Sequence, residues 1–157
     1  MTKFEKAIKL IEERYGNKEE VIGLATIAIS KNQDRKPRPA VRMVCAYYED
    51  GAFYISTDAR QAKMLQIAEN NEVAVCGLGW YSFQGIAENL GWVKEEKNAH
   101  IRANFKKYFE WFDDHGGEDD PNSIILKITL TEGTIIDHEA KYGEQKYVID
   151  FVNKTAE

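Results

Sequence analysis

The side chains best suited to chemistry are a guanidinium, two hydroxyls and an ammonium within one short stretch of chain: Arg42, Ser56, Thr57 and Lys63. Arginine offers a planar fork of hydrogen-bond donors, and lysine offers a point charge. Both bind a phosphate ester well when hydroxyls and the start of a helix lie beside them. The stretch therefore predicts a site for a phosphate-bearing ligand.

The elements around these residues are predicted to be a strand, a tight turn, a second strand and the start of a helix. Residues 38–48 and 52–57 are strand-like, and the Asp-Gly pair between them is a strong hairpin signal. Asp58 is a suitable N-cap for a helix over residues 59–70, which would place Lys63 near the helix end that attracts anions. The residues of this helix expected to pack inward are Met64, Leu65, Ile67 and Ala68.

Alternation along the first hairpin strand places Arg42 among apolar neighbours. Val44, Ala46 and Tyr48 share its face, while the other face carries Val41, Met43, Cys45 and Tyr47. A face that mixes a guanidinium with apolar residues is not simply solvated, so we expect a ligand or a partner subunit against it. Along the second strand, alternation lets only one of the hydroxyls at 56 and 57 point straight at a given side.

The rest of the chain predicts a mainly β (α+β) organisation. The predicted elements are an amphipathic helix over 3–15, a strand over 21–30 buried on both faces, a polar turn over 31–37, strands over 72–78 and 80–88, a helix over 94–112 with an aromatic stripe, an acidic turn over 113–121, and strands over 123–137 and 145–152. Gly77, Gly79 and Gly85 suggest bulges or close backbone approach.

Six or seven mostly antiparallel strands with helices between them favour a small barrel with flanking helices, formed by residues 1–157 as one domain. The sequence has no Gly-x-Gly-x-x-Gly turn that opens a helix, which argues against a Rossmann-type dinucleotide site.

Composition narrows the function classes. A net charge of −5 argues against a nucleic-acid-binding protein, because affinity for a phosphate backbone depends on clustered lysine and arginine. The sequence shows neither a signal peptide nor a run long enough to cross a bilayer, so we expect a cytoplasmic protein. Cys45 and Cys76 lie in apolar strand-like runs and are expected to be buried thiols.

Other candidate chemistry is weaker. His100, His115 and His138 lack metal-ligand spacing and are expected at the surface, and the acidic turn lacks the spacing of a calcium loop. No metal site is therefore predicted. The aromatic residues at 80, 81 and 83 are expected in the core. No Ser/His/Asp or Cys/His arrangement can be built from spacing, so no catalytic side chain is assigned.

These motifs, taken in order, resemble a known family. Arg42-Met43-Val44, the Asp-Gly turn, Ser56-Thr57, Lys63 and Asn70-Asn71-Glu72-Val73-Ala74-Val75 are similar to the FMN-binding split barrel of the pyridoxamine 5′-phosphate oxidase-like superfamily. Residues 23–27 resemble the first barrel strand of that superfamily, and residues 83–88 resemble a later strand with a Gly-x-Ala-Glu pattern. The recognisable motifs cover roughly residues 20–90.

The resemblance implies a split barrel that binds FMN between the subunits of a homodimer. By similarity, Arg42 and Lys63 would hold the FMN phosphate, and Ser56 and Thr57 would contact the phosphate or the ring edge. Met43-Val44 would present backbone to the isoalloxazine. The flavin would carry two-electron redox chemistry on a small-molecule substrate or electron donor, without a side-chain acid or nucleophile.

Two departures distinguish the chain from true pyridoxamine phosphate oxidases. Those enzymes have a second basic residue immediately before the helix lysine; here Ala62 stands there, and Arg60 is the nearest substitute. The Arg-rich C-terminal substrate segment also has no match, so vitamin B6 oxidation is not expected. The alternatives are a non-catalytic flavin or haem carrier of the same fold, a deazaflavin-binding relative, and a cofactor-free dimer. Turnover with a reduced nicotinamide separates an enzyme from a carrier.

Overall fold

The computed structural model describes residues 1–29, 33–34 and 36–157. The elements in chain order are α1 (Lys3–Tyr15), β1 (Glu20–Ala28), β2 (Arg38–Glu49), β3 (Ala52–Asp58), α2 (Ala62–Glu69), β4 (Glu72–Gly77), β5 (Tyr81–Trp92), a 3₁₀ turn (Glu96–Asn98), α3 (Ala99–Tyr108), α4 (Phe112–His115), β6 (Ser123–Asp137), β7 (Gln145–Asp150) and β8 (Thr155–Ala156). The predicted end of the first strand at residue 30 and part of the predicted turn over 31–37 lie outside the described residues.

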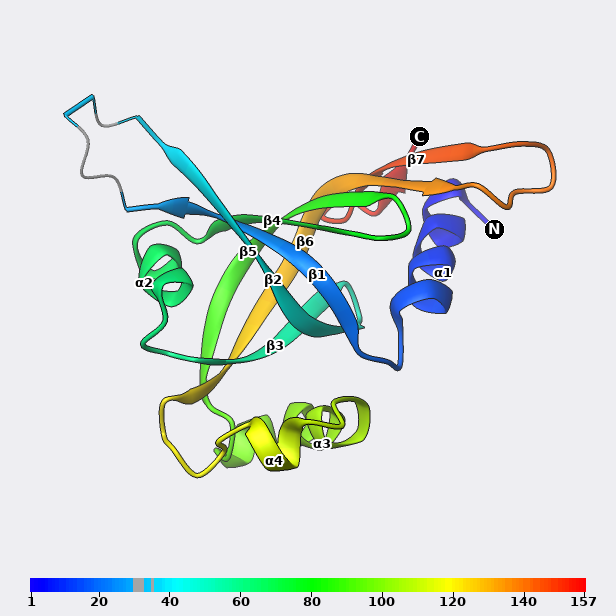
Figure 1. The fold of residues 1–157 in the computed structure, drawn as a ribbon. Coiled ribbons are helices and arrows are strands. Elements are labelled where there is room, and N and C mark those ends of the chain that lie inside the picture. The colour runs from blue at the N-terminus through cyan, green and yellow to red at the C-terminus, as the bar shows by residue number, and fades with distance from the viewer. Residues whose placement is uncertain (30–32, 35) are drawn as a thin grey trace.

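The strands form one antiparallel sheet in the order β3-β2-β1-β4-β5-β6-β7-β8, and β3 also pairs with β6. This extra pairing closes six strands into a barrel, from which β7 and β8 extend (Figure 1). The predicted antiparallel split barrel with flanking helices is confirmed. At the register shift between Gln84 and Gly85, a Cβ on Gly85 would lie 2.7 Å from the backbone oxygen of Thr129. Only glycine fits this close approach.

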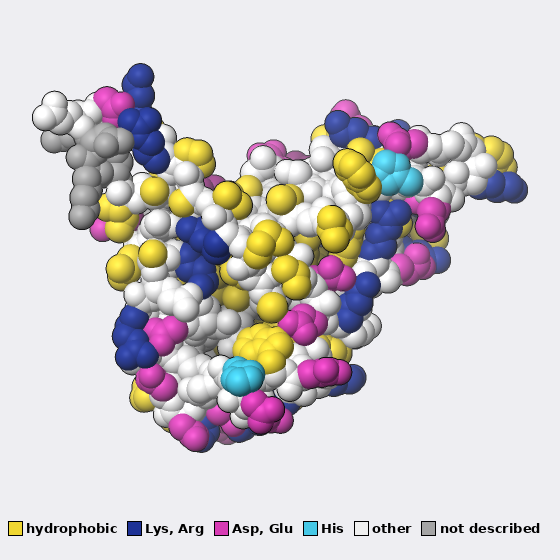
Figure 2. All heavy atoms as spheres, viewed as in Figure 1, with side chains coloured by type: hydrophobic (Ala, Val, Ile, Leu, Met, Phe, Trp, Pro, Cys, Tyr) yellow, Lys and Arg dark blue, Asp and Glu magenta, His cyan; other side chains and the backbone are white. Residues whose placement is uncertain are grey.

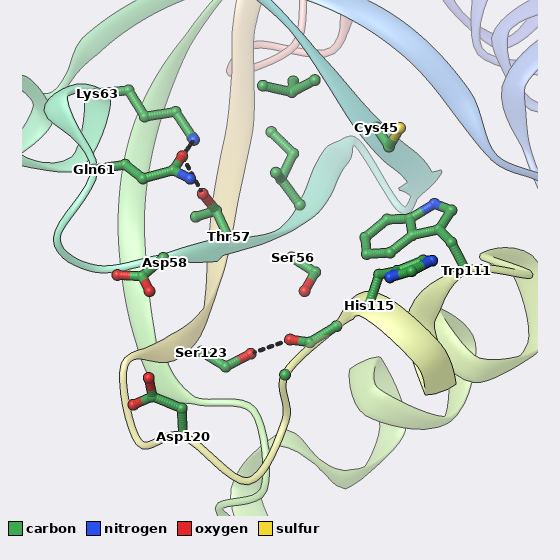
Figure 3. Close-up of a pocket in the computed structure, with 14 residues that line it drawn as sticks. Cys45, Ser56, Thr57, Asp58, Gln61, Lys63, Trp111, His115, Asp120 and Ser123 are labelled. Carbon is green, nitrogen blue, oxygen red and sulfur yellow. Dashed lines mark hydrogen bonds between the residues drawn. The ribbon is translucent and has the colours of Figure 1, made fainter.

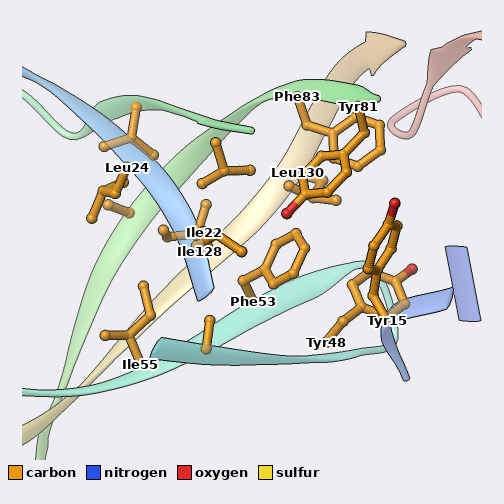
Figure 4. Close-up of a cluster of buried hydrophobic side chains, with 14 of the residues drawn as sticks. Tyr15, Ile22, Leu24, Tyr48, Phe53, Ile55, Tyr81, Phe83, Ile128 and Leu130 are labelled. Carbon is orange, nitrogen blue, oxygen red and sulfur yellow. The ribbon is translucent and has the colours of Figure 1, made fainter. Parts of the chain in front are cut away.

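The main core fills the barrel and consists of aromatic and branched aliphatic side chains. Figure 4 shows Phe53, Tyr81 and Phe83 grouped near one end, with ring centroids 6.1 Å apart for the first pair and 5.0 Å for the second. Branched side chains of β1, β3 and β6 extend this core along the barrel, and those labelled are Ile22, Leu24, Ile55, Ile128 and Leu130.

The expectation that the first strand is buried on both faces is wrong. Ile22 and Leu24 are fully buried in β1, whereas Val21 of the same strand is 53% exposed. Alternate residues of a barrel strand point outward. The unbroken apolar run of β1 therefore gives the strand an apolar outer face, and not a second buried face.

That outer face explains one further correction, and the β4–β5 turn explains another. Cys76 is exposed and Cys45 is half-buried, so the prediction of two buried thiols is wrong. Cys45 pairs with Val21 and Cys76 pairs with Gly23, so both thiols lie on the side of the sheet that carries the exposed Val21. Tyr81 and Phe83 are buried as expected, but Trp80 is 68% exposed because the β4–β5 turn places it at a φ of 60°, outside the strand. Figure 2 shows apolar side chains gathered at the centre of the viewed face, where β1, β2 and β4 lie.

A second core lies beneath the barrel, between its lower end and the helices α3 and α4 (Figure 1). The single helix predicted over 94–112 is wrong, because α3 ends at Tyr108 and Phe109 has an extended backbone. The break allows Phe109 and Phe112 to pack on Phe105 at centroid distances of 5.1 and 5.5 Å, with Tyr47 against them. The aromatic stripe is thus buried by a turn of the chain rather than along one continuous helix.

An ion pair ties α3 to the loop before β6 and makes a pH-dependent prediction. Arg102 donates two hydrogen bonds to Glu118, at 2.7 and 3.0 Å, and Lys106 lies 3.3 Å from the same carboxylate. The hydrogen bonds from Arg102 lower the pKa of Glu118 from its ordinary 4.5 to about 2. A depressed pKa in the folded state stabilises the fold above the unfolded-state pKa, and this stabilisation is lost as pH falls through the folded-state value.

We therefore expect the free energy of unfolding to fall between pH 4.5 and about 2, and to fall less steeply in Glu118→Gln. Urea unfolding of both proteins at a series of pH values measures this difference, since the other carboxylates titrate in both. Identical slopes would show that the ion pair does not contribute.

In the part of the chain that the structure describes, no helix is both long enough and apolar enough to span a membrane.

Candidate functional site

A cavity of about 390 Å³ opens between the β2–β3 hairpin, the start of α2 and the loop that follows α4 (Figure 3). Its lining residues are Val44, Cys45, Ile55, Ser56, Thr57, Asp58, Gln61, Lys63, Trp111, His115, Gly116, Gly117, Asp120 and Ser123. The hairpin predicted from the Asp-Gly turn supplies one wall, as the sequence suggested. The opposite wall comes from α4 and its loop.

Lys63 forms the basic end of the cavity. Its side chain is only 8% exposed, and its ammonium donates a hydrogen bond to Oε1 of Gln61. The Thr57 hydroxyl donates to the same oxygen at 3.3 Å. Burial lowers the pKa of Lys63, and the positive charge of Arg42 lowers it further. An ammonium held beside a second cation in a partly dry site favours an anionic ligand.

Arg42 lies next to this end but does not line the cavity. Its guanidinium donates to the Thr26 hydroxyl at 2.7 Å, to Oε1 of Gln66 at 2.8 Å and to the Leu24 carbonyl at 3.1 Å. Burial lowers the pKa of Arg42. Within the described residues neither Arg42 nor Lys63 makes an ion pair with a carboxylate, although the charge of Asp58 acts on Lys63 at longer range.

The start of α2 differs from the prediction. The helix begins at Ala62 with Gln61 as N-cap, rather than with Asp58. Asp58 instead accepts hydrogen bonds from the backbone and guanidinium of Arg60, which lower the pKa of this carboxyl to about 2. Arg60 also pairs with Asp120 at 2.9 Å, so two carboxylates balance its charge, and it does not line the cavity. Lys63 does lie in the first turn of the helix, as predicted.

The predicted inward face of α2 is half right. Met64 and Ile67 are buried, but Leu65 is 54% exposed and Ala68 is exposed. Helix α2 packs against β1 and buries one face there, so its buried stripe is narrower than the sequence pattern suggested.

The remaining predicted site residues divide between the two faces of the hairpin. Val44, Ser56 and Thr57 line the cavity, whereas Met43 points outward and is 64% exposed. The two hydroxyls serve different parts of the cavity: Thr57 points toward Gln61, and Ser56 lies on the side of Ser123 (Figure 3).

Sequence reasoning missed the opposite wall. Trp111, the N-cap of α4, and His115, its last residue, line the cavity beside Gly116, whose carbonyl accepts a hydrogen bond from Ser123 at 2.9 Å. His115 is exposed, as expected of a surface residue, yet it is also part of the cavity. The signal that was missed is Trp111, which is close to the aromatic stripe in sequence but does not fit the helical spacing of that stripe. The helix breaks after Tyr108, and this break places Trp111 at the cavity.

The sequence profile of the pyridoxamine 5′-phosphate oxidase family matches residues 4–137. The chain belongs to this family. No functionally curated protein matches it in sequence.

Solved structures of similar fold include members of the same family. A pyridoxamine 5′-phosphate oxidase-related, FMN-binding protein from Nostoc punctiforme is 14% identical, with a TM-score of 0.60 over 100% of this chain and 95% of that one. A protein related to general stress protein 26 from Clostridium acetobutylicum is 14% identical, with a TM-score of 0.61 over 97% and 96% of the two chains. An F420 reductase is 13% identical, with a TM-score of 0.54 over 77% and 94%. These likenesses show a shared fold.

Proposed function

We propose that residues 1–157 form an FMN-binding flavoprotein domain that catalyses two-electron redox chemistry on a small molecule. The observation that carries this proposal is that two cations, Lys63 and Arg42, lie near each other at the start of α2, with the Thr57 hydroxyl beside them. Both cations are partly desolvated and lack a carboxylate ion pair within the described residues. A phosphate monoester carries the charge and the acceptor oxygens that such a donor set satisfies.

The donor set fits an FMN phosphate in chemical detail. The oxygen of Gln61 receives hydrogen bonds from Lys63 and Thr57, and a phosphate oxygen can take its place without leaving either donor unpaired. The first N–H groups of α2 add donors and a favourable dipole. The apolar side chains of Val44 and Ile55 provide a wall against which a flat ring can pack.

When bound, the flavin supplies two-electron transfer, while the protein provides position, exclusion of water and electrostatics. By the resemblance in sequence, Ser56 and the β2 backbone at Met43-Val44 are the groups proposed to contact the ring. Family membership and the FMN-binding relative from Nostoc punctiforme support FMN as the flavin. The F420 reductase of similar fold is consistent with redox chemistry on this barrel.

Redox function is tested by loading the purified protein with FMN and following consumption of a reduced nicotinamide nucleotide under air. We expect donor oxidation at a rate above that of free FMN. A protein that binds FMN but does not exceed the rate of free FMN would be a carrier, and the oxidoreductase proposal would fail.

The homodimer implied by the resemblance is proposed to form through the apolar outer face of β1, β2 and β4. Val41 and Met43 are 71% and 64% exposed on this face, and Val21 is 53% exposed. A contiguous apolar face of this kind marks an interaction surface.

A charge at the centre of this face is expected to break the dimer. Met43→Asp would place an unpaired carboxylate in the interface, which should weaken dimerisation at least about 100-fold. Sedimentation of the variant measures the change. Val148→Asp is the control, because it introduces the same carboxylate at an exposed position of β7, outside the proposed interface. A Met43→Asp protein that still sediments as the wild-type dimer would place the interface elsewhere.

A further inference from the structure

The end of the cavity away from Lys63 is an aromatic wall. Trp111 is the N-cap of α4 and His115 is its last residue, one helical turn later, and the His115 backbone N–H donates to the Trp111 carbonyl at 2.8 Å. Residues at this spacing lie on one face of a helix. Both side chains line the cavity, and Figure 3 shows them together on the side opposite Lys63 and Gln61.

The Trp111 indole is held firmly in place. One face stacks on Phe109, at a centroid distance of 5.2 Å and an interplanar angle of 12°, and Phe109 is itself buried. The indole N–H donates to Glu19 Oε1 at 2.8 Å. With its edge and one face engaged, the indole has a single face left to offer a ligand in the cavity.

The charge behind this wall is negative. Glu19 makes no ion pair in the part of the chain that the structure describes, and its carboxylate interacts with the Trp111 indole and the Cys45 thiol. Burial, together with hydrogen bonding to Glu19 and its charge, raises the pKa of Cys45 to about 11, so the thiol stays protonated and adds no second charge. Asp58 and Asp120 lie on the Lys63 side of the cavity in Figure 3 and both pair with Arg60, so the negative charge at the Trp111 end comes from Glu19.

When an indole N–H donates to a carboxylate, the negative charge polarises the N–H bond and raises the electron density of the ring. The face of the indole then has a more negative electrostatic potential. Tryptophan is already the side chain whose face attracts cations most strongly. The two ends of the cavity therefore differ in sign: the Lys63 end suits an anion, and the Trp111 end suits a flat group that is positively charged.

We propose that Trp111, with Glu19 behind it and His115 beside it, binds a planar aromatic cation of the alkylpyridinium class as the substrate-side ligand of this site. Assignment of this ligand as substrate rests on the proposed function, in which the Lys63 end holds the flavin phosphate. The wall is a feature of α4 and of the loop before β1, and it does not depend on the residues assigned to the phosphate.

The test titrates two probes of the same ring size into the protein, with and without FMN, by calorimetry: 1-methylnicotinamide as the cation and nicotinate as the anion. We expect the cation to bind at least about tenfold more tightly than the anion. Trp111→Leu should weaken the cation at least about tenfold and leave FMN affinity within about twofold.

Glu19→Gln is the matched variant, because its amide oxygen can still accept from the indole N–H while the charge is gone. It should weaken the cation several-fold and leave nicotinate unchanged, so the test stands even where Trp111→Leu fails to fold. Unchanged cation affinity in Glu19→Gln, or tighter binding of nicotinate than of the cation, overturns the proposal. Cation binding that depends on Glu19 in a protein unable to bind FMN supports the aromatic wall and refutes the flavin function instead.

Discussion

Replacement of Lys63 and Arg42 together by alanine is expected to lower FMN affinity at least about 100-fold. Each side chain would contribute a charge-assisted hydrogen bond to the phosphate, and such bonds are worth about 1.5–3 kcal/mol apiece. Each hydrogen bond therefore contributes more than about tenfold to the affinity for FMN, and the two together contribute at least about 100-fold. Fluorescence titration of FMN against the wild type and the variant measures the loss.

The single variant Lys63→Ala separates a binding role from a structural one. Lys63 is buried beside the charge of Arg42, and its pKa is lowered for that reason, so removing it relieves an unfavourable contact. We expect Lys63→Ala alone to change the free energy of unfolding by less than about 1 kcal/mol. Lys9→Ala, at a solvated position of α1, is the matched control and should change neither property.

Riboflavin provides a second control, because it has the flavin ring without the phosphate. The wild type should prefer FMN to riboflavin by at least about 100-fold, and the double variant should lose this preference. An unchanged preference for FMN in the double variant would mean that the phosphate binds elsewhere.

Phe53→Ala is expected to destabilise the fold by about 3–5 kcal/mol. Phe53 is fully buried on β3, where it packs against Tyr48 and Tyr81 at centroid distances of 5.5 and 6.1 Å. Its partner across the closing pair of strands is Ile128. The substitution leaves a cavity at the point where β3 joins β6 to complete the barrel, and the surrounding rings cannot collapse fully into it.

Chemical denaturation measures this loss, and Val148→Ala on the exposed side of β7 is the control, with an expected change within about 0.5 kcal/mol. Because β3 also carries Ser56 and Thr57, we expect FMN affinity of the Phe53 variant to weaken as the barrel loosens. A loss of stability no larger than in the control would show that β3 does not close the core as described.

The parts of the fold that were predicted from the sequence are those with strong local signals. The helix over 3–15 has a capping box between Thr2 and Glu5 and a regular apolar stripe, and the β2–β3 hairpin has its Asp-Gly turn with Asp50 at a φ of 48° and Gly51 at 77°. These signals act between near neighbours, so tertiary packing did not need to be known.

The parts that were not predicted depend on distant contacts. Asp58 is a good N-cap by type, but Arg60 and, through it, Asp120 hold its carboxylate, so the helix starts later. The break after Tyr108 is favoured by packing of Phe109 and Phe112 on Tyr47 of β2, which no local pattern reveals.

The candidate site shows the same division. Val44, Ser56, Thr57 and Lys63 are brought together by the hairpin and the helix that follows it, and the spacing of these residues predicted that grouping. Trp111, His115 and Glu19 come from segments far apart in the sequence and meet only in the folded chain. A helical stripe of aromatic residues predicts a core, and it cannot show which ring next to it turns toward a cavity.

The most direct test of the flavin assignment is the visible absorption spectrum of the purified protein after incubation with FMN and removal of free flavin by gel filtration. We predict a yellow complex with about one FMN per chain in the wild type, and a colourless protein when Lys63 and Arg42 are both alanine. A wild-type protein that emerges without FMN would contradict the central claim and leave a split-barrel protein whose basic site binds another anion.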